Sequence, residues 1–182
     1  TGIATDAELL NARDCTEEDR IVLSSGIIAM SGQMRGLVES MLDLARVEGN
    51  AAKAEFRDIS LSELVSTVVM QFEPLFFEKG MKLNSEIMPG IMVMGVEAQL
   101  KQLADILIDN ALKYAMPGGE TVIRLKCISP RRCVLEVSDQ GEPIEPEELK
   151  ELFKRFYRAD RARATNHSYG LGLSIAPSIA AT

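Results

Sequence analysis

The chain has 182 residues, of which 46% are hydrophobic and 26% charged, so it can bury a core and is neither disordered nor a disulfide-stapled miniprotein. Lys and Arg total 20 against 27 Asp and Glu, a formal charge of −7, which argues against general binding to nucleic acid or to anionic membranes. The longest apolar runs, such as 91–94, fall far short of the roughly 18 residues that span a bilayer, so we expect no direct membrane contact.

A long amphipathic helix is predicted over 16–48. Its apolar side chains recur at alternating spacings of four and three residues, which is typical of the seam of a coiled coil or four-helix bundle. They are Leu23, Ile27, Met30, Met34, Leu37, Met41 and Leu44. Thr16-Glu17-Glu18-Asp19 resembles a capping box at its start. Because residues 3–10 look like the end of another helix, residues 1–49 are expected to form a helical hairpin that pairs with a second copy in a homodimer.

After a short linker the chain alternates between strands and helices. A strand over 56–59, the capping box Ser60-Leu61-Ser62-Glu63 and a helix up to Gly80 come first. Two predicted strands, 82–87 and 91–94, then flank the turn Met88-Pro89-Gly90.

A third helix over 97–115 and a β-hairpin complete the predicted core. In the helix four apolar side chains are expected to face the core: Leu103, Ile106, Leu107 and Leu112. Strands over 121–128 and 133–138 alternate apolar and polar residues around the turn Ser129-Pro130-Arg131-Arg132. Helices on one face of a mixed or antiparallel sheet make a two-layer α+β sandwich, so we assign 1–49 to the hairpin and 50–182 to this second domain.

Four short motifs in the second domain carry polar chemistry. Asn110-Ala111-Leu112-Lys113-Tyr114 places an amide, an ammonium and an aromatic ring on one helix face. Asp139-Gln140-Gly141 puts a carboxylate at a strand end before a glycine, where backbone can approach a ligand closely. The segments 153–160 and 170–176, F-K-R-F-Y-R-A-D and G-L-G-L-S-I-A, follow. Each motif alone is weak evidence, but the four in this order are informative together.

In this order the motifs resemble those of the catalytic ATP-binding domain of bacterial sensor histidine kinases. N-A-L-K-Y is similar to the family's N box, D-x-G to its first glycine box, F-K-R-F-Y-R-A-D to its F box and G-L-G-L-S-I-A to its second glycine box. M-L-D-L-A-R-V-E resembles the end of the family's dimerisation and phosphotransfer hairpin, so the resemblance covers essentially the whole chain. It implies a Bergerat-type, histidine kinase ATPase-like fold, with ATP and Mg²⁺ as cofactors.

The resemblance implies a role for each residue of the first two motifs. Asn110 would offer its side-chain oxygen to Mg²⁺, and Lys113 would place a positive charge near the phosphates. Tyr114 would pack against the nucleotide or the lid that covers it. Asp139 would accept a hydrogen bond from the adenine amine, and Gly141 would keep a side chain out of the base pocket.

Apolar residues of the later motifs would enclose the nucleotide. Ile144 and Leu173 would form part of the walls of the base pocket. Phe153 and Phe156 would anchor one end of an ATP lid over 161–169.

Basic residues and backbone amides would meet the phosphates. Six Lys and Arg side chains crowd into residues 150–163 of an otherwise acidic chain, which makes a local anion site. Gly170-Leu171-Gly172 would open a helix whose amides point at phosphate. The expected catalytic residues are Asn110, Lys113, Arg155 and Arg158.

Several positions depart from the family's pattern. The phosphorylated histidine would lie a few residues before Thr1, and two further strands would follow Thr182. Ile106 stands where these kinases usually carry another Asn and the related ATP-hydrolysing proteins carry a Glu base, which favours a kinase over an ATPase. Pro143 and Ser168 occupy positions where glycine is common.

The cysteines and the single histidine predict no metal centre. Cys15, Cys127 and Cys133 lack a C-x-x-C spacing, and His167 falls in the expected lid. Reduced thiols in a cytoplasmic protein are the simplest interpretation.

The leading hypothesis is therefore the ATP-binding core of a two-component sensor kinase. In the intact protein the γ-phosphoryl group would pass to a histidine and then to an aspartate on the receiver domain of a response regulator. The chain would be the cytoplasmic portion of a sensor that is anchored in the membrane elsewhere. The alternative is a degenerate, non-catalytic module that senses ATP or binds a partner.

Overall fold

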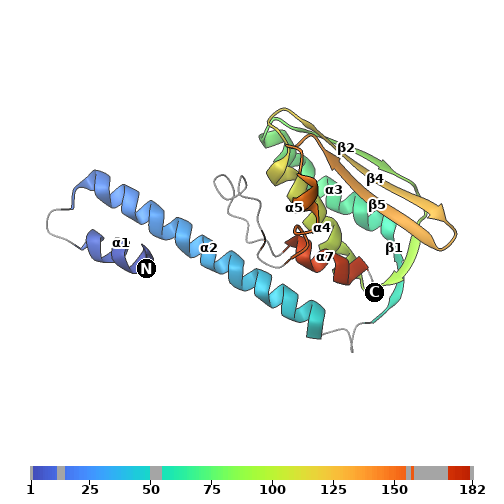
Figure 1. The fold of residues 1–182 in the computed structure, drawn as a ribbon, viewed down its shortest axis with the longest axis horizontal. Coiled ribbons are helices and arrows are strands. Elements are labelled where there is room, and N and C mark those ends of the chain that lie inside the picture. The colour runs from blue at the N-terminus through green and yellow to red at the C-terminus, as the bar shows by residue number, and fades with distance from the viewer. Residues whose placement is uncertain (1, 12–14, 50–54, 155–156, 158–171, 181–182) are drawn as a thin grey trace. The chain divides into compact units, whose positions relative to one another are not determined.

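The computed structural model describes the chain except for residues 1, 12–14, 50–54, 155–156, 158–171 and 181–182. The chain folds into two compact units, Thr1–Arg46 and Val47–Thr182 (Figure 1). Within the described ranges, no helix combines the length and the apolar character needed to cross a membrane.

The first unit is built from helix α1, Gly2–Leu10, and helix α2, Glu17–Gly49. Thr16 and Asp19 cap α2 reciprocally, because the Asp19 amide donates to the Thr16 hydroxyl and the Thr16 amide donates to the Asp19 carboxylate. The Thr16 hydroxyl also donates to that carboxylate at 2.6 Å, and these bonds lower the pKa of Asp19. The predicted capping box is confirmed.

Two faces of α2 carry apolar side chains. On one face α1 packs close enough that a Cβ on Gly2 would lie 2.6 Å from the Met30 sulfur. The predicted seam residues Leu23, Ile27 and Met30 are half-buried, whereas the side chains of Leu37, Met41 and Leu44 lie outside the described part of the helix. Met34, also predicted in the seam, is 61% exposed. Further large apolar side chains of α2 are exposed: Ile21, Val22, Ile28, Val38 and Leu42.

The second unit contains two small sheets and the remaining helices. The strands are β1 Arg57–Ser60, β2 Lys82–Ile87, β3 Met92–Gly95, β4 Glu120–Ser129 and β5 Arg132–Asp139. The helices are α3 Leu61–Glu78, α4 Glu97–Tyr114, α5 Pro146–Leu149 and α7 Gly172–Ala180.

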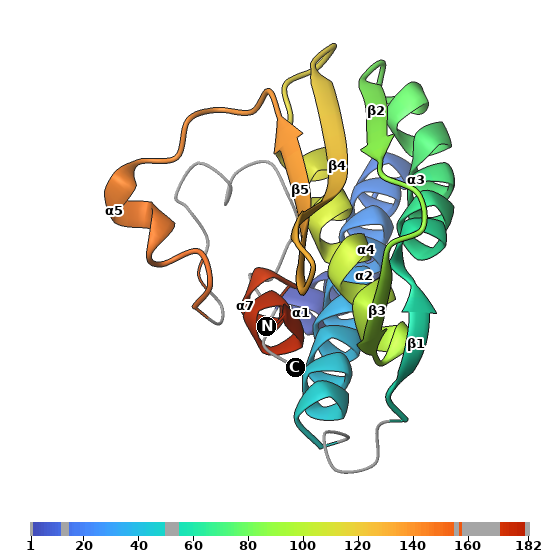
Figure 2. The ribbon, with the colours of Figure 1, turned by 90° about the vertical axis from the view of Figure 1, so that its right-hand side faces the viewer.

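The larger sheet has the order β2-β4-β5, and helices α3 and α4 cover one of its faces (Figures 1 and 2). β4 pairs with β2 in parallel and with β5 antiparallel, so the sheet is mixed. β1 and β3 form a separate antiparallel pair. The two strands that flank the turn at Gly90 therefore belong to different sheets. The predicted two-layer α+β arrangement is confirmed.

The side of α4 that faces the core differs from the prediction. Of the four residues expected there, Leu112 is buried, whereas Leu103, Ile106 and Leu107 are half-buried. The fully buried stripe of this helix is Ala104, Ile108, Ala111 and Leu112. The prediction was right for Leu112 and wrong for the other three, because close packing at the core admits the small side chains Ala104 and Ala111 beside Ile108.

Buried polar contacts fix α3 in place. The Ser62 hydroxyl donates to the Met88 carbonyl at 2.7 Å and accepts from the Ile91 amide at 2.9 Å, which ties the helix to the turn at Gly90, where φ is 75°. At the other end the Lys79 ammonium donates to the Leu112 carbonyl at 3.0 Å. Because the last carbonyls of a helix have no partner within it, this bond satisfies the end of α4 and holds the two helices together.

Candidate functional site

Helix α4 forms the common wall of the candidate site. Ile106, Asn110 and Tyr114 succeed one another at intervals of four residues, so they lie along one face of the helix, and all three are half-buried. Lys113 is exposed and forms an ion pair with Asp109 on the helix surface. The amide and the ring therefore face partly enclosed space, beside the fully buried stripe that holds α4 in the core.

The first glycine box lies against the C-terminal end of α4. Gly141 forms an isolated antiparallel bridge with Ala115, and the Met116 amide donates to the Gln140 carbonyl at 3.0 Å. A Cβ on Gly141 would lie 2.6 Å from the Asp139 carboxylate and 3.0 Å from the Tyr114 carbonyl. Glycine is therefore required here by space, because any side chain would push the carboxylate or the helix end aside.

Asp139 ends β5 beside this close approach. Partial burial raises the pKa of its carboxyl, although a hydrogen bond from the Gly141 backbone acts in the opposite direction. The residue nonetheless retains exposed surface. A carboxylate that is crowded on one side and open on the other suits a ligand that donates a hydrogen bond to it.

Thr121 is a candidate site residue that the sequence patterns did not single out. It pairs directly with Asp139 across β4 and β5, so the two side chains lie on the same face of the sheet. Thr121 is 0% exposed, and its hydroxyl has no hydrogen-bond partner among the described residues. The signal available in the sequence was a hydroxyl at an inward position of an alternating strand, just before Ile123 and Leu125.

The second glycine box reaches the same wall of α4. Gly172 begins α7, and a Cβ placed on it would lie 3.6 Å from the Ile106 side chain. The helix packs against the unit through its buried residues Ile175, Ala176 and Ile179. Because Ile106 is one helical turn before Asn110, the start of α7 lies about a turn along α4 from the predicted metal-binding amide.

Other predicted site residues are exposed or lie outside the described chain. Ile144 is 47% exposed and Phe153 is 52% exposed, whereas Leu173 in α7 is half-buried. The Lys154 ammonium pairs with Glu151 at 2.7 Å in the basic run. Five predicted residues fall outside the described ranges: Arg155, Phe156, Arg158, Gly170 and Leu171.

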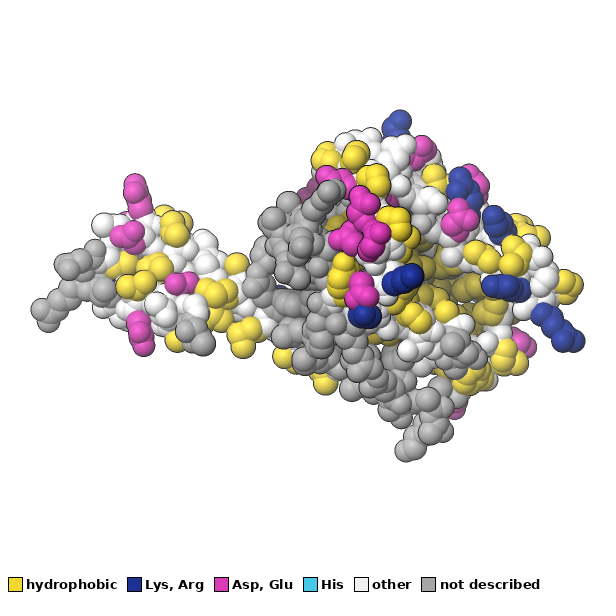
Figure 3. Space-filling view, in the orientation of Figure 1, with side chains coloured by type: hydrophobic (Ala, Val, Ile, Leu, Met, Phe, Trp, Pro, Cys, Tyr) yellow, Lys and Arg dark blue, Asp and Glu magenta, His cyan; other side chains and the backbone are white. Residues whose placement is uncertain are grey.

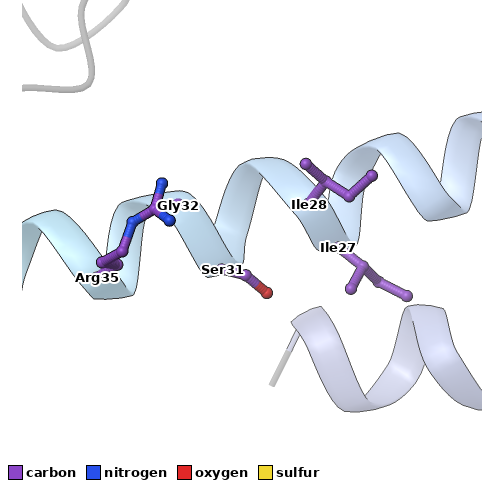
Figure 4. Close-up of a pocket in the computed structure, with 5 residues that line it drawn as sticks. All are labelled: Ile27, Ile28, Ser31, Gly32 and Arg35. Atoms are coloured by element: carbon purple, nitrogen blue, oxygen red, sulfur yellow. The ribbon is translucent and has the colours of Figure 1, made fainter.

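A hollow on the first unit is a different feature. Its volume is about 270 Å³, and all of its lining residues come from α2: Ile27, Ile28, Ser31, Gly32 and Arg35 (Figure 4). A space lined by one helix is a surface groove, and Ser31 and Arg35 are the polar side chains among its lining residues.

Comparison with known proteins decides the family. Residues 95–182 match the family described as histidine kinase-, DNA gyrase B- and HSP90-like ATPase. The sensor protein DltS of Streptococcus agalactiae serotype III (strain NEM316) is 33% identical over 153 residues, which cover 84% of this chain and 38% of that protein. The chain carries the catalytic ATP-binding domain of a bacterial sensor histidine kinase.

Further relatives of this kinase domain agree. The signal transduction histidine-protein kinase/phosphatase MprB of Mycobacterium ulcerans (strain Agy99) is 32% identical over 186 residues, covering 96% of this chain and 34% of that protein. A solved structure of a mycobacterial sensor histidine kinase MprB is 26% identical with a TM-score of 0.60, covering 69% of this chain and 78% of that one. The chain spans about a third of the length of the two curated relatives.

The environment of Asp139 predicts its titration. In the free chain its carboxyl should titrate above the usual range for aspartate, because burial raises its pKa. At pH values above the native pKa, the ionised Asp139 carboxyl therefore lowers the free energy of unfolding. This destabilisation disappears at pH values below the ordinary aspartate pKa.

Binding of adenosine should lower the pKa of Asp139, since a donated hydrogen bond favours the ionised form. Carbon-detected NMR titration of the Asp139 carboxyl, with and without adenosine, measures both shifts. If the pKa of Asp139 is unchanged at saturating adenosine, this carboxylate does not bind the base.

Proposed function

We propose that the kinase domain binds Mg·ATP with its adenine at Asp139 and its phosphates between Asn110 and the start of α7. The observation that carries this proposal is the close approach of Gly141 to Asp139 and Tyr114, because a Cβ on residue 141 would lie 2.6 Å from the Asp139 carboxylate that is proposed to bind the base. Adenine presents an amine where guanine presents a carbonyl, so an ionised Asp139 favours adenine.

The proposed magnesium site depends on the nucleotide. Among the described residues, no group of three His, Cys, Asp or Glu side chains could hold a metal ion. Mg²⁺ commonly binds through one or two protein oxygens together with phosphate oxygens and water, and the half-buried Asn110 amide fits that role. When bound, the ion would neutralise charge on the transferred phosphoryl group.

In the intact protein we infer two successive phosphoryl transfers. First the bond between the γ-phosphorus and its bridging oxygen breaks, ADP leaves, and a phosphorus–nitrogen bond forms on an imidazole of the phosphotransfer hairpin. The group then passes to an aspartate oxygen of a response regulator, and the imidazole is restored. The catalytic domain contributes positioning and charge stabilisation. In this proposal Lys113, Arg155 and Arg158 place positive charge near the phosphates of ATP.

We also propose the domain boundaries and the location of the chain. Residues 1–49 would be part of the dimerisation and phosphotransfer hairpin, and 50–182 the catalytic domain. The chain would be the cytoplasmic portion of its sensor, where ATP and the response regulator are available.

Replacing Asp139 tests the adenine assignment. Asp139→Asn should weaken binding of a non-hydrolysable ATP analogue by at least about tenfold in calorimetry, because an amide cannot reproduce the carboxylate's acceptor geometry. Asp58→Asn is the matched control, since Asp58 lies on β1 in the other sheet. Equal affinity in the two variants, with both folded by circular dichroism, would contradict the assignment.

Replacing Thr121 separates a ligand contact from a structural role. Thr121→Val keeps the shape of the side chain and removes a buried hydroxyl that has no partner among the described residues, so the free energy of unfolding should stay constant or rise by about 1 kcal/mol. If the hydroxyl binds the nucleotide, directly or through water, analogue affinity should fall about fivefold to tenfold. Thr67→Val on the exposed face of α3 serves as the control. A stable Thr121→Val protein with full affinity would exclude this contact.

A transfer assay distinguishes the kinase from a non-catalytic module, the alternative motivated by Ile106, Pro143 and Ser168. The chain is mixed with a separate phosphotransfer hairpin that contains its histidine and with ATP labelled in the γ-phosphate. Acid-labile label on the hairpin is the result that the kinase predicts. Analogue binding without any transfer would favour the module, and steady phosphate release without transfer would favour an ATPase.

The exposed apolar face of α2 supports the proposed homodimer. Ile21, Ile28 and Leu42 lie at heptad multiples on this face and are 61%, 71% and 51% exposed. Ile28→Glu should shift the chain to monomer in sedimentation, because the charge would be buried in the interface. Met70→Glu changes an equally exposed apolar residue on α3 and should leave the association unchanged. A dimer that survives Ile28→Glu would place the interface elsewhere.

A further inference from the structure

Two cysteines face each other near the end of the β4–β5 hairpin. Cys127 and Cys133 are direct partners in the antiparallel register, so their side chains lie on the same face. The last pairing of β4 with β2 joins Ile87 to Leu125, and the strands beyond it continue as a two-stranded ribbon (Figure 1). The cysteines therefore lie where only one neighbouring strand constrains each backbone.

The register suits a covalent link. Directly opposed residues of antiparallel strands have Cα atoms about 4.5–5.5 Å apart. A disulfide needs a Cα separation of about 4.4–6.8 Å and a Cβ separation of about 3.5–4.5 Å. The register shifts between Cys127 and Ser129, immediately beyond the pair. Because bulged ribbons twist more readily than flat sheets, the small approach of the two Cβ atoms is accessible here.

The two thiols differ in accessibility. Cys127 is exposed, whereas Cys133 is half-buried. Burial, assisted by the neighbouring Cys127, raises the pKa of the Cys133 thiol. An exposed thiol reacts first with an external reagent, and a less accessible neighbour then resolves the product.

Basic residues near the hairpin end raise the local positive potential. Arg131 lies in the exposed turn that joins the two strands, whereas Arg132 begins β5 and Lys126 precedes Cys127, so both lie on the opposite face of the ribbon from the two cysteines. Figure 3 shows Lys and Arg side chains at this end of the unit, at the right of the view. Of these, Lys126 lies 3.8 Å from Glu136, which offsets part of its charge.

We propose that Cys127 and Cys133 form a reversible dithiol site that is oxidised by low-molecular-weight disulfides carrying carboxylates. The Cys127 thiolate attacks one sulfur of the reagent, which breaks its sulfur–sulfur bond, releases one thiolate and leaves a mixed disulfide. The Cys133 thiolate then attacks the Cys127 sulfur and releases the second thiolate. Both cysteines lose their protons, the pair is oxidised by two electrons, and the reagent is reduced to two thiols.

Oxidised glutathione is the probe for this site. The full chain is incubated with it, quenched with acid and mapped by mass spectrometry without reduction. A peptide that joins Cys127 to Cys133 and has lost two hydrogens is the expected product, and dithiothreitol should reverse it. Cys133→Ser should accumulate glutathione on Cys127, and Cys127→Ser should react more slowly at Cys133. Cys15→Ser, which changes the cysteine of the other unit, should still form the link.

Other products overturn the proposal. These are separate glutathione adducts on both cysteines of the unaltered chain, a link from either cysteine to Cys15, or covalent dimers as the main product. Failure of nucleotide binding or of phosphoryl transfer would leave this result unaffected, because the dithiol lies on the hairpin and not on the wall formed by α4.

Discussion

The approach of Gly141 to the end of α4 is the contact on which the site depends. The turn after Asp139 lies so close to the end of α4 that a Cβ on residue 141 would be 3.0 Å from the Tyr114 carbonyl. This contact fixes how close the acidic group at the end of β5 lies to the end of helix α4. The bridge between Ala115 and Gly141 and the bond from Met116 to Gln140 keep the two segments in register.

The rest of the second unit holds that contact in place. Helix α4 buries Ala104 and Ala111, and Lys79, which follows the last residue of α3, donates to the carbonyl of Leu112 three residues before Ala115. The β4–β5 pairing fixes Asp139 opposite Thr121, and α7 buries its apolar side against the unit so that Gly172 meets Ile106. The proposed nucleotide site thus depends on tertiary packing around one helix.

Local features of the chain could be predicted from the sequence. The capping boxes at Thr16 and Ser60, the turn at Gly90 and the hairpin around 129–132 follow from side-chain chemistry within a few residues. Long-range features could not be predicted from the sequence. The parallel pairing of β2 with β4 joins segments separated by a helix and a strand, and no local pattern encodes its register. Thr121 was missed for the same reason, because its importance comes from the cross-strand position of Asp139.

Relaxation of NMR signals by ATP bound to Mn²⁺ tests the central claim most directly, because the paramagnetic ion broadens only nuclei near the phosphates and chemical shifts report the base. If α4 is the common wall, the Asn110 side-chain amide and the Gly172 amide should broaden strongly, while the Gly141 amide should shift on binding of the diamagnetic Mg²⁺ complex. Broadening centred on the groove of α2, with Asn110 and Gly172 unaffected, would contradict this account.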